Sequence, residues 1–313
     1  MTQSISVIEP VHQAIATTKR LLFAPFDLLK WLGLGFTAWL AMLSDGSPTA
    51  NFANLACKHP DAQPFQAAGD MILAHLALVI ALAACIGVFI LAAALVVAWV
   101  SSRGKFMFLD NVVRNRAEIA APWKSTRAQG NSYFLFSLGF GLAALAVLGI
   151  ILLIGALIAM PDITRHQFGA NAIGAIILGG LLLMLYIIVL TCVMIFLGDF
   201  IIPIMALRSC RALAAWSEFF DLFKAHTGAF IRYLLFKVVL GWAAGAITLI
   251  FCCCLCCVMW IPYVGAVILL PLSVFLRCYS LHFLEQFGGR YQLFQREASE
   301  YLAVAHEPQG APV

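Results

Sequence analysis

The sequence predicts an all-α, polytopic membrane protein with about six transmembrane helices in three hairpins and amphipathic helices on the cytoplasmic side. Of its 313 residues, 63% are hydrophobic and only 11% are charged, whereas roughly a quarter are charged in a soluble domain. The apolar residues form long blocks, such as Met71 to Val100 and Tyr133 to Met160. Each block exceeds the roughly 20 residues that cross a hydrocarbon core, which favours membrane spans over the helices of a soluble core.

Residues 1–25 are predicted to form a cytoplasmic N-terminal segment with an amphipathic helix over Ile8 to Phe23. Lys19 and Arg20 lie on the side that would face water or lipid headgroups. The apolar side holds four residues: Val11, Ile15, Leu22 and Phe23. We expect this helix to lie along the inner membrane surface.

Residues 26–287 are predicted to form the membrane domain, with spans at about 26–43, 71–100, 133–160, 172–198, 233–259 and 264–284. The first span is short enough to be re-entrant, which leaves four or five spans open as an alternative. Pro161 and Asp162 are expected to end the third span and begin the turn of a helical hairpin. The polar residues 288–313 are expected to be a cytoplasmic tail.

The segment from Asp199 to Pro203 interrupts the helical pattern after the fourth span. Proline removes one backbone donor and clashes with the preceding turn, so we expect a kink or helix break near Pro203. The stretch from Arg208 to His226 is then amphipathic again. Its apolar side gathers Leu213, Trp216, Phe219, Phe220 and Phe223, and we expect it to lie along the inner headgroups.

The distribution of Lys and Arg predicts the orientation of the chain. Of the nineteen Lys and Arg residues, only Lys58 and Arg165 fall on the predicted outer side. Because cytoplasmic loops carry an excess of positive charge, both termini are expected in the cytoplasm. The predicted location is the cytoplasmic (inner) membrane of a bacterium, with several crossings.

Asp199, Arg277 and Lys237 form the candidate polar site. Asp199 and Arg277 lie near the cytoplasmic ends of two spans, at about 12 to 14 Å from the headgroup level by helical rise, where an unpaired charge is costly. The two side chains can form a structural ion pair or help to bind a polar substrate or lipid headgroup. Each can instead extend independently to the interface.

The ten cysteines predict neither a disulfide framework nor a metal site. The cysteine run from Cys252 to Cys257 falls inside a predicted span, where a thiolate is disfavoured and cysteine serves as a small packing residue. Cys57, His59 and His166 on the outer side lack a ligand spacing. We expect no metal and no cofactor.

Other motifs narrow the functional classes. The chain holds no glycine-rich phosphate loop, no His-Glu-x-x-His and no nucleophile elbow with partners, so the sequence leans against an enzyme without excluding one. The positive charges never build a broad basic domain, so no nucleic-acid partner is expected. Gly241 and Gly245 permit close helix approach, either inside the monomer or in a homo-oligomer.

The last two spans carry the most distinctive sequence. The cysteine run is followed by Ile261-Pro262-Tyr263-Val264-Gly265, Leu269-Leu270-Pro271, Val274-Phe275-x-Arg277 and Phe283-Leu284-Glu285-Gln286-Phe287-Gly288. Together with Asp199 to Met205, this text resembles an uncharacterised family of bacterial integral membrane proteins, a domain of unknown function. The resemblance covers about Phe26 to Phe294 and implies no activity. It marks Pro203, Pro262, Gly265, Pro271 and Gln286 as a candidate structural motif.

More distantly, the hairpins joined by amphipathic segments are similar to the membrane domain of some glycerophosphodiester phosphodiesterases. The catalytic domain of those proteins has no counterpart in this sequence, so the resemblance does not imply hydrolysis. The sequence thus favours a lipid- or protein-binding or assembly module of the cytoplasmic membrane, with membrane lipids and a cytoplasmic protein as candidate partners. The alternative is a transporter or lipid-handling channel with a polar site at the cytoplasmic helix ends.

Overall fold

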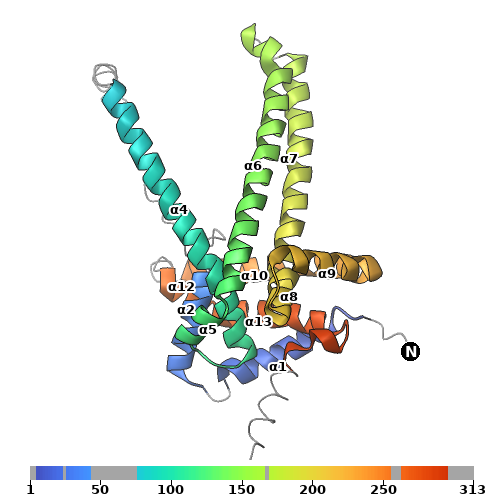
Figure 1. The fold of residues 1–313 in the computed structure, drawn as a ribbon. Coiled ribbons are helices and arrows are strands. Elements are labelled where there is room, and N and C mark those ends of the chain that lie inside the picture. Colours follow the sequence, from blue (N-terminus) through green and yellow to red (C-terminus); the bar gives the residue numbers. More distant parts are fainter. Residues whose placement is uncertain (1–4, 24–25, 44–75, 166–168, 255–261, 295–313) are drawn as a thin grey trace, which may run out of the picture.

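The computed structural model describes residues 5–23, 26–43, 76–165, 169–254 and 262–294. Three long helices project from a base that the other described helices form (Figure 1). We call these three helices the legs: α4 (Leu76–Val113), α6 (Arg127–Thr164) and α7 (Ala170–Phe196). The base contains α1 (Glu9–Phe23), α2 (Leu28–Met42), α5 (Ala120–Ser125), α8 (Ile202–Arg208), α9 (Ala212–Ala225), α10 (Thr227–Cys254), α12 (Pro262–Ile268) and α13 (Leu270–Glu285).

Four helical stretches of the described chain are long and apolar enough to cross a membrane. They are Ile80–Val113, Arg127–Asp162, Ala170–Arg208 and Thr227–Cys254. Large apolar side chains such as Leu135 and Leu157 are exposed on the legs, and a helix that is apolar on all sides needs an apolar surrounding. These helices indicate a multi-pass membrane protein.

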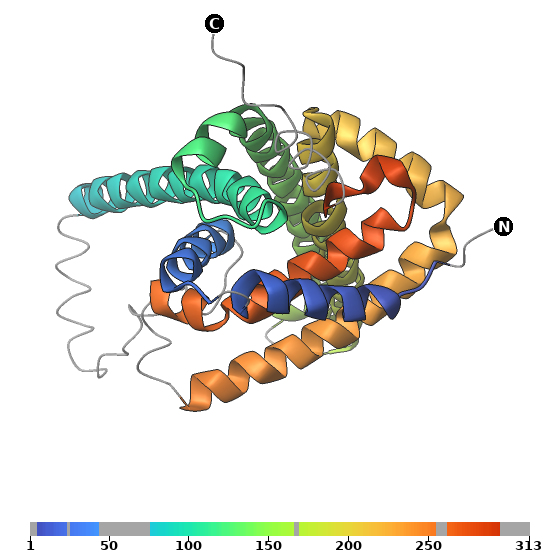
Figure 2. The same ribbon diagram turned by 90° about the horizontal axis from the view of Figure 1, so that it is seen from below.

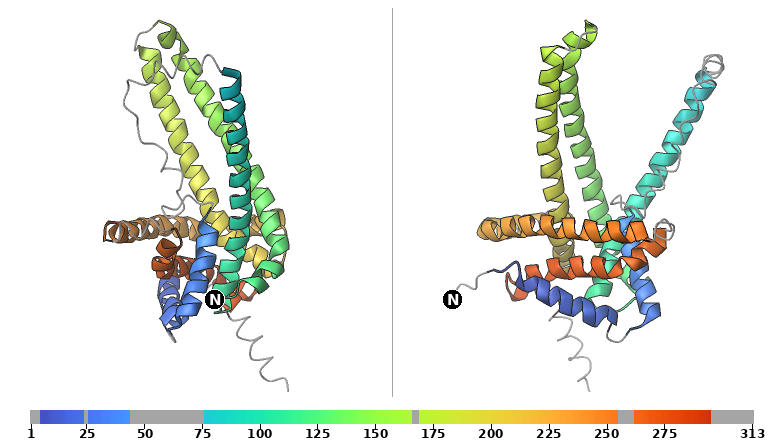
Figure 3. Two further views of the ribbon diagram at one scale, coloured as in Figure 1. Left: turned by 90° about the vertical axis from the view of Figure 1, so that its left-hand side faces the viewer. Right: turned by 180° about the vertical axis from the view of Figure 1, so that it is seen from behind.

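The structure does not arrange these four stretches as one parallel bundle. The α6 and α7 helices stand side by side, whereas α10 lies across their long axis (Figure 3). The predicted sixth span is divided into α12 and α13 around Leu269, and ten residues of α13 are buried in the base. The count of six spans in three hairpins therefore stays a prediction, and residues 71–75 of the second span lie outside the described residues.

The α6–α7 pair departs from the sequence prediction at its turn. The α6 helix continues through Pro161 to Thr164 instead of ending at Pro161. A proline this close to a helix end removes only one hydrogen bond near the terminus. The carboxylate of Asp162 then accepts the N–H groups of Gly169 at 3.1 Å and Ala172 at 2.8 Å, which caps the first turn of α7.

The N-terminal helix α1 packs on α13 (Figure 2). It buries Ala14, Thr18, Leu21 and Leu22. Of the predicted apolar side, Leu22 is buried, but Ile15 and Phe23 are each 53% exposed. The small side chains of Ala14 and Thr18 let α1 approach α13, and contact of the predicted apolar side with the inner membrane surface stays a prediction.

Polar contacts at the end of α13 bind the N-terminal segment. The Ser6 N–H donates to Oε1 of Gln286, and Nε2 of Gln286 donates to the Ser6 carbonyl, both at 2.9 Å. His282 lies between the Thr17 hydroxyl at 3.0 Å and the Glu285 carboxylate at 2.9 Å. Gln286, which the sequence singled out as a motif residue, thus joins two segments far apart in the chain.

The apolar core lies in the base and is rich in aromatic rings. Phe200 stacks on Phe219 at 5.5 Å between ring centroids and meets Tyr233 edge-on at 4.9 Å. Phe230 and Phe283 complete this group, which we call the aromatic core. All five side chains are buried, and they come from four different segments, so the aromatic core holds the base together.

Neither the described cysteines of α10 nor its glycine pair, Gly241 and Gly245, is seen to pack against another helix in the described chain. Cys252, Cys253 and Cys254 are free thiols, while Cys256 and Cys257 lie outside the described residues. No described atom lies within 4 Å of a Cβ built on Gly241 or Gly245. Packing of this pair inside the monomer is therefore not seen in the described chain, and a homo-oligomer stays a prediction.

The aromatic core predicts a large stability loss on Phe200→Ala. Removing this fully buried ring should lower the free energy of unfolding by about 3–5 kcal/mol, measured by SDS titration in mixed micelles. The matched control is Leu213→Ala on α9, because Leu213 is 73% exposed and its truncation should cost far less. Equal losses for the two variants would contradict the assignment of the core.

Candidate functional site

A single π-helical turn, Leu197–Ile201 (η2), joins α7 to α8. In it the Ile202 N–H donates to the Leu197 carbonyl five residues earlier, in place of the α-helical partner four residues earlier, Gly198. The next residue, Pro203, has no N–H to offer. The helix is therefore not broken at Pro203, but the carbonyl of Gly198 is left without a donor from its own helix.

Arg277 of α13 supplies the missing donor. Its Nη1 donates to the Gly198 carbonyl at 2.6 Å, and the side chain is half-buried. No carboxylate in the described part of the chain lies within salt-bridge distance of this guanidinium. Arg277 and Asp199 are thus neighbours, as the sequence suggested, but Arg277 binds the backbone one residue before Asp199 instead of pairing with its carboxylate.

The direct ionic partner of Asp199 is Lys237 of α10. Their Nζ and Oδ2 atoms lie 2.9 Å apart, and the two side chains are only 15% and 13% exposed, respectively. The Tyr233 hydroxyl donates to the same carboxylate oxygen at 2.8 Å. Sequence reasoning missed Tyr233, although its position one turn before Lys237 puts both groups on one side of a helix.

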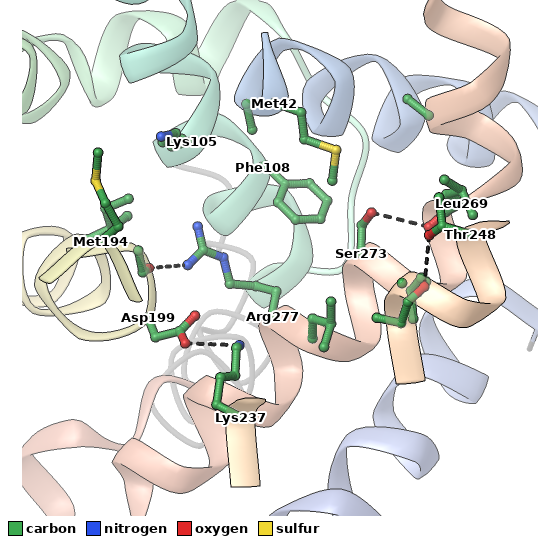
Figure 4. A pocket seen from close by; sticks show the side chains of 18 of the residues that line it. Met42, Lys105, Phe108, Met194, Asp199, Lys237, Thr248, Leu269, Ser273 and Arg277 are labelled. Atoms are coloured by element: carbon green, nitrogen blue, oxygen red, sulfur yellow. Dashed lines mark hydrogen bonds and ion pairs between the residues drawn. The ribbon is translucent and has the colours of Figure 1, made fainter. Parts of the chain in front are cut away.

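These charged groups line a pocket of about 670 Å³ where the legs meet the base. In Figure 4, Lys105, Asp199, Lys237 and Arg277 gather on one side, and Ser273, Leu269 and Thr248 lie on the other. The hydroxyls of Ser273 and Thr248 already donate to backbone carbonyls of their own helices. The pocket therefore has one strongly charged side and one side whose hydroxyl groups already donate to the backbone.

Lys105 reaches the pocket because α2 and α4 approach closely beside it. A Cβ built on Gly104 would lie 2.7 Å from the backbone carbon of Leu40, so only glycine fits at this crossing. The next residue, Lys105, lines the pocket, and its Nζ lies 5.6 Å from the ring centroid of Tyr133. Lys105 could not be found from the sequence, because nothing in its spacing relates it to Asp199.

The remaining motif residues shape helix ends outside the pocket lining. Pro203 and Pro271 are the second residues of α8 and α13. The missing N–H of Pro271 costs little at the start of a helix, whereas that of Pro203 leaves the Gly198 carbonyl to Arg277. Pro262 begins α12, and the Gly265 carbonyl accepts the N–H of Leu269. These four residues position the elements that carry the charged groups.

Metal binding has no support in the described residues, in which no three His, Cys, Asp or Glu side chains are placed to hold an ion. Cys57, His59 and His166 lie outside the described ranges.

Comparison with known proteins places the chain among proteins whose role is not established. A family model described as "Family of unknown function (DUF7544)" matches residues 5–272. The matched region includes Asp199 and Lys237 and ends before Arg277. No curated protein and no solved structure matches the chain.

The site geometry predicts that Asp199 is coupled more strongly to Lys237 than to Arg277. In double-mutant cycles with Asp199→Asn, the Lys237→Met cycle should give an interaction free energy of about 1–3 kcal/mol, since each single change leaves a mostly buried charge unpaired. The Arg277→Gln cycle should give a smaller value. SDS unfolding of the single and double variants measures both cycles, and additive effects at Asp199 and Lys237 would refute the ion pair.

Proposed function

The chain belongs to the family of unknown function DUF7544, and we propose that it is a membrane-embedded module that binds the anionic headgroup of a membrane lipid. The observation that carries the proposal is the charge of the pocket. Its described lining holds three cations, Lys105, Lys237 and Arg277, and one carboxylate, Asp199. Among these groups, the guanidinium of Arg277 binds a neutral carbonyl instead of a carboxylate, which favours a negatively charged ligand beside it.

The position of the pocket supports a lipid as the source of that charge. Lys105 follows the apolar part of α4, and Asp199 follows the apolar part of α7. If these helices cross the bilayer, the charged side of the pocket lies where the hydrocarbon core meets the headgroups. The apolar side of the same pocket suits the part of an acyl chain that lies next to the glycerol of the lipid.

We place the pocket in the inner leaflet of the cytoplasmic membrane. The orientation rests on the Lys and Arg distribution in the sequence, and the anionic lipids of that leaflet attract basic groups near the surface. In this arrangement α10 lies along the edge of the hydrocarbon, which suits its exposed Trp242 and Val239. The exposed Leu213 and Phe220 of α9 are then available to headgroups or to a cytoplasmic protein.

A lipid-handling path is the second candidate function. A groove of about 380 Å³ shares Gly198, Asp199 and Lys237 with the pocket and continues along α7 past Leu190. Such a groove could guide a lipid between leaflets as well as hold one. Movement of fluorescent anionic lipid across protein-containing vesicles would favour this candidate, and binding without movement would favour the module.

Loss of a pocket cation should weaken binding of phosphatidylglycerol. Native mass spectrometry of the detergent-solubilised chain should show roughly tenfold weaker retention for Lys105→Gln and for Arg277→Gln, since a charge-assisted hydrogen bond contributes about 1.5–3 kcal/mol. Arg290→Gln, a change of the same charge at an exposed site outside the pocket, is the control. Because Arg277 also supports the π turn, Lys105→Gln is the more selective variant. Unchanged retention in both pocket variants would overturn the proposal.

A further inference from the structure

Two apolar paths leave the Asp199–Lys237 ion pair in different directions. Building on the proposed function, on which this step rests, we infer that the bound anionic lipid has two acyl chains, which separate at the ion pair and follow different helices. The ion pair is the place where the paths meet, because Asp199 and Lys237 line both the pocket and the groove along α7. A lysolipid with the same headgroup and a single chain fills only part of this site.

The first path, which we call the α7 path, is the groove beside α7. It has a volume of about 380 Å³, and the eight residues from Leu190 to Gly198 give it a length of about 12 Å along the helix. The Thr191 hydroxyl in this groove donates to the Ile187 carbonyl at 2.7 Å, so its donor is used within α7. The other side chains that line the groove beyond the ion pair are apolar: Leu190, Met194 and Ile195.

The second path, which we call the α10 path, is the apolar part of the pocket of about 670 Å³. It follows α10 from Lys237 to Thr248, eleven residues or about 16 Å of helix. Small residues of α10, Ala244 and Gly245, leave room on this side, and the Thr248 hydroxyl donates to the Ala244 carbonyl at 2.9 Å. The segment from α12 to α13 adds further lining residues: Ala266, Leu269, Leu272 and Ser273.

The directions of the two paths require two chains. The α10 helix lies across the long axis of α7 (Figure 3), so a single chain that leaves the ion pair follows one path and leaves the other without an occupant. The walls of an empty apolar space lose the dispersion contacts that an occupant provides. A diacyl lipid carries both chains on one glycerol, and its chains can enter both paths from one headgroup position.

Arg277 anchors the headgroup close to the point where the paths meet. Its Nη1 donates to the Gly198 carbonyl at 2.6 Å, and its guanidinium lies beside Asp199 in Figure 4. In the described chain no carboxylate lies within salt-bridge distance of this guanidinium, and the other N–H groups of an arginine fork suit phosphate oxygens. A phosphate at Arg277 places the glycerol near the ion pair, where both paths begin.

Photolabelling of the full-length wild-type protein in nanodiscs tests this arrangement without any variant. The probes are phosphatidylglycerol with a diazirine in one or the other acyl chain and phosphatidylethanolamine labelled in the same two ways. The excess of phosphatidylglycerol labelling over phosphatidylethanolamine labelling, mapped by peptide mass spectrometry, should fall on both α7 and the α10 path. An excess confined to one path would overturn the two-chain inference and leave the proposed function standing. No excess on either path would overturn the proposed function.

A matched pair of variants tests the α10 path separately. Ala244→Phe places a ring in the path, whereas Ala243→Phe makes the same change at the neighbouring exposed residue outside the described pocket lining. Native mass spectrometry in detergent should show that Ala244→Phe lowers the preference for phosphatidylglycerol over lysophosphatidylglycerol roughly tenfold, because a ring overpacks an occupied apolar space. Retention of lysophosphatidylglycerol should change little, since its chain can still use the α7 path.

Ala243→Phe should retain the wild-type preference, and thermal unfolding verifies that both variants are folded. Because each preference is compared with that of the wild-type protein, the general tendency of two-chain lipids to remain in the micelle cancels. An equal preference in Ala244→Phe and the wild-type protein would overturn the second chain in the α10 path. It would leave the anionic headgroup site untouched.

Discussion

One backbone carbonyl, that of Gly198, joins the end of α7 to α13 in the base. The π turn directs the Ile202 N–H to Leu197, and Pro203 has no N–H to replace it, so the carbonyl must find a donor elsewhere or pay the cost of an unpaired buried group. The donor is Arg277 of α13. This hydrogen bond joins α13 to the end of α7. It also holds the guanidinium of Arg277 in the pocket.

The aromatic core and the charged pocket share the elements on either side of this contact. Phe200 belongs to the π turn and packs in the core, while its neighbour Asp199 faces the pocket. Tyr233 belongs to the aromatic core and also contacts the charged pocket, since its ring lies against Phe200 and its hydroxyl donates to Asp199. The stability of the base and the placement of the charges therefore depend on the same few residues, which gives the pocket a rigid wall.

The sequence was informative where an effect is local or compositional. Long apolar blocks predicted helices that can cross a membrane, and Pro203 marked the place where the helical pattern changes. Asp199 and Arg277 were candidates because an unpaired charge near the end of a span is costly, and Lys237 was a candidate to line a cavity with them. The structure places all three in one pocket. Their partners could not be predicted, because the pairing depends on how α10 and α13 cross α7. For the same reason Lys105 was missed, since it reaches the pocket through the crossing of α2 and α4 at Gly104.

The most direct test of the central claim is a cryo-electron microscopy map of the protein in nanodiscs that contain anionic lipid. The account predicts headgroup density in the pocket, within hydrogen-bond distance of Arg277 and Lys105, with an acyl chain along α7. A map in which side chains fill this space, or in which lipid density avoids the charged side of the pocket, would contradict it.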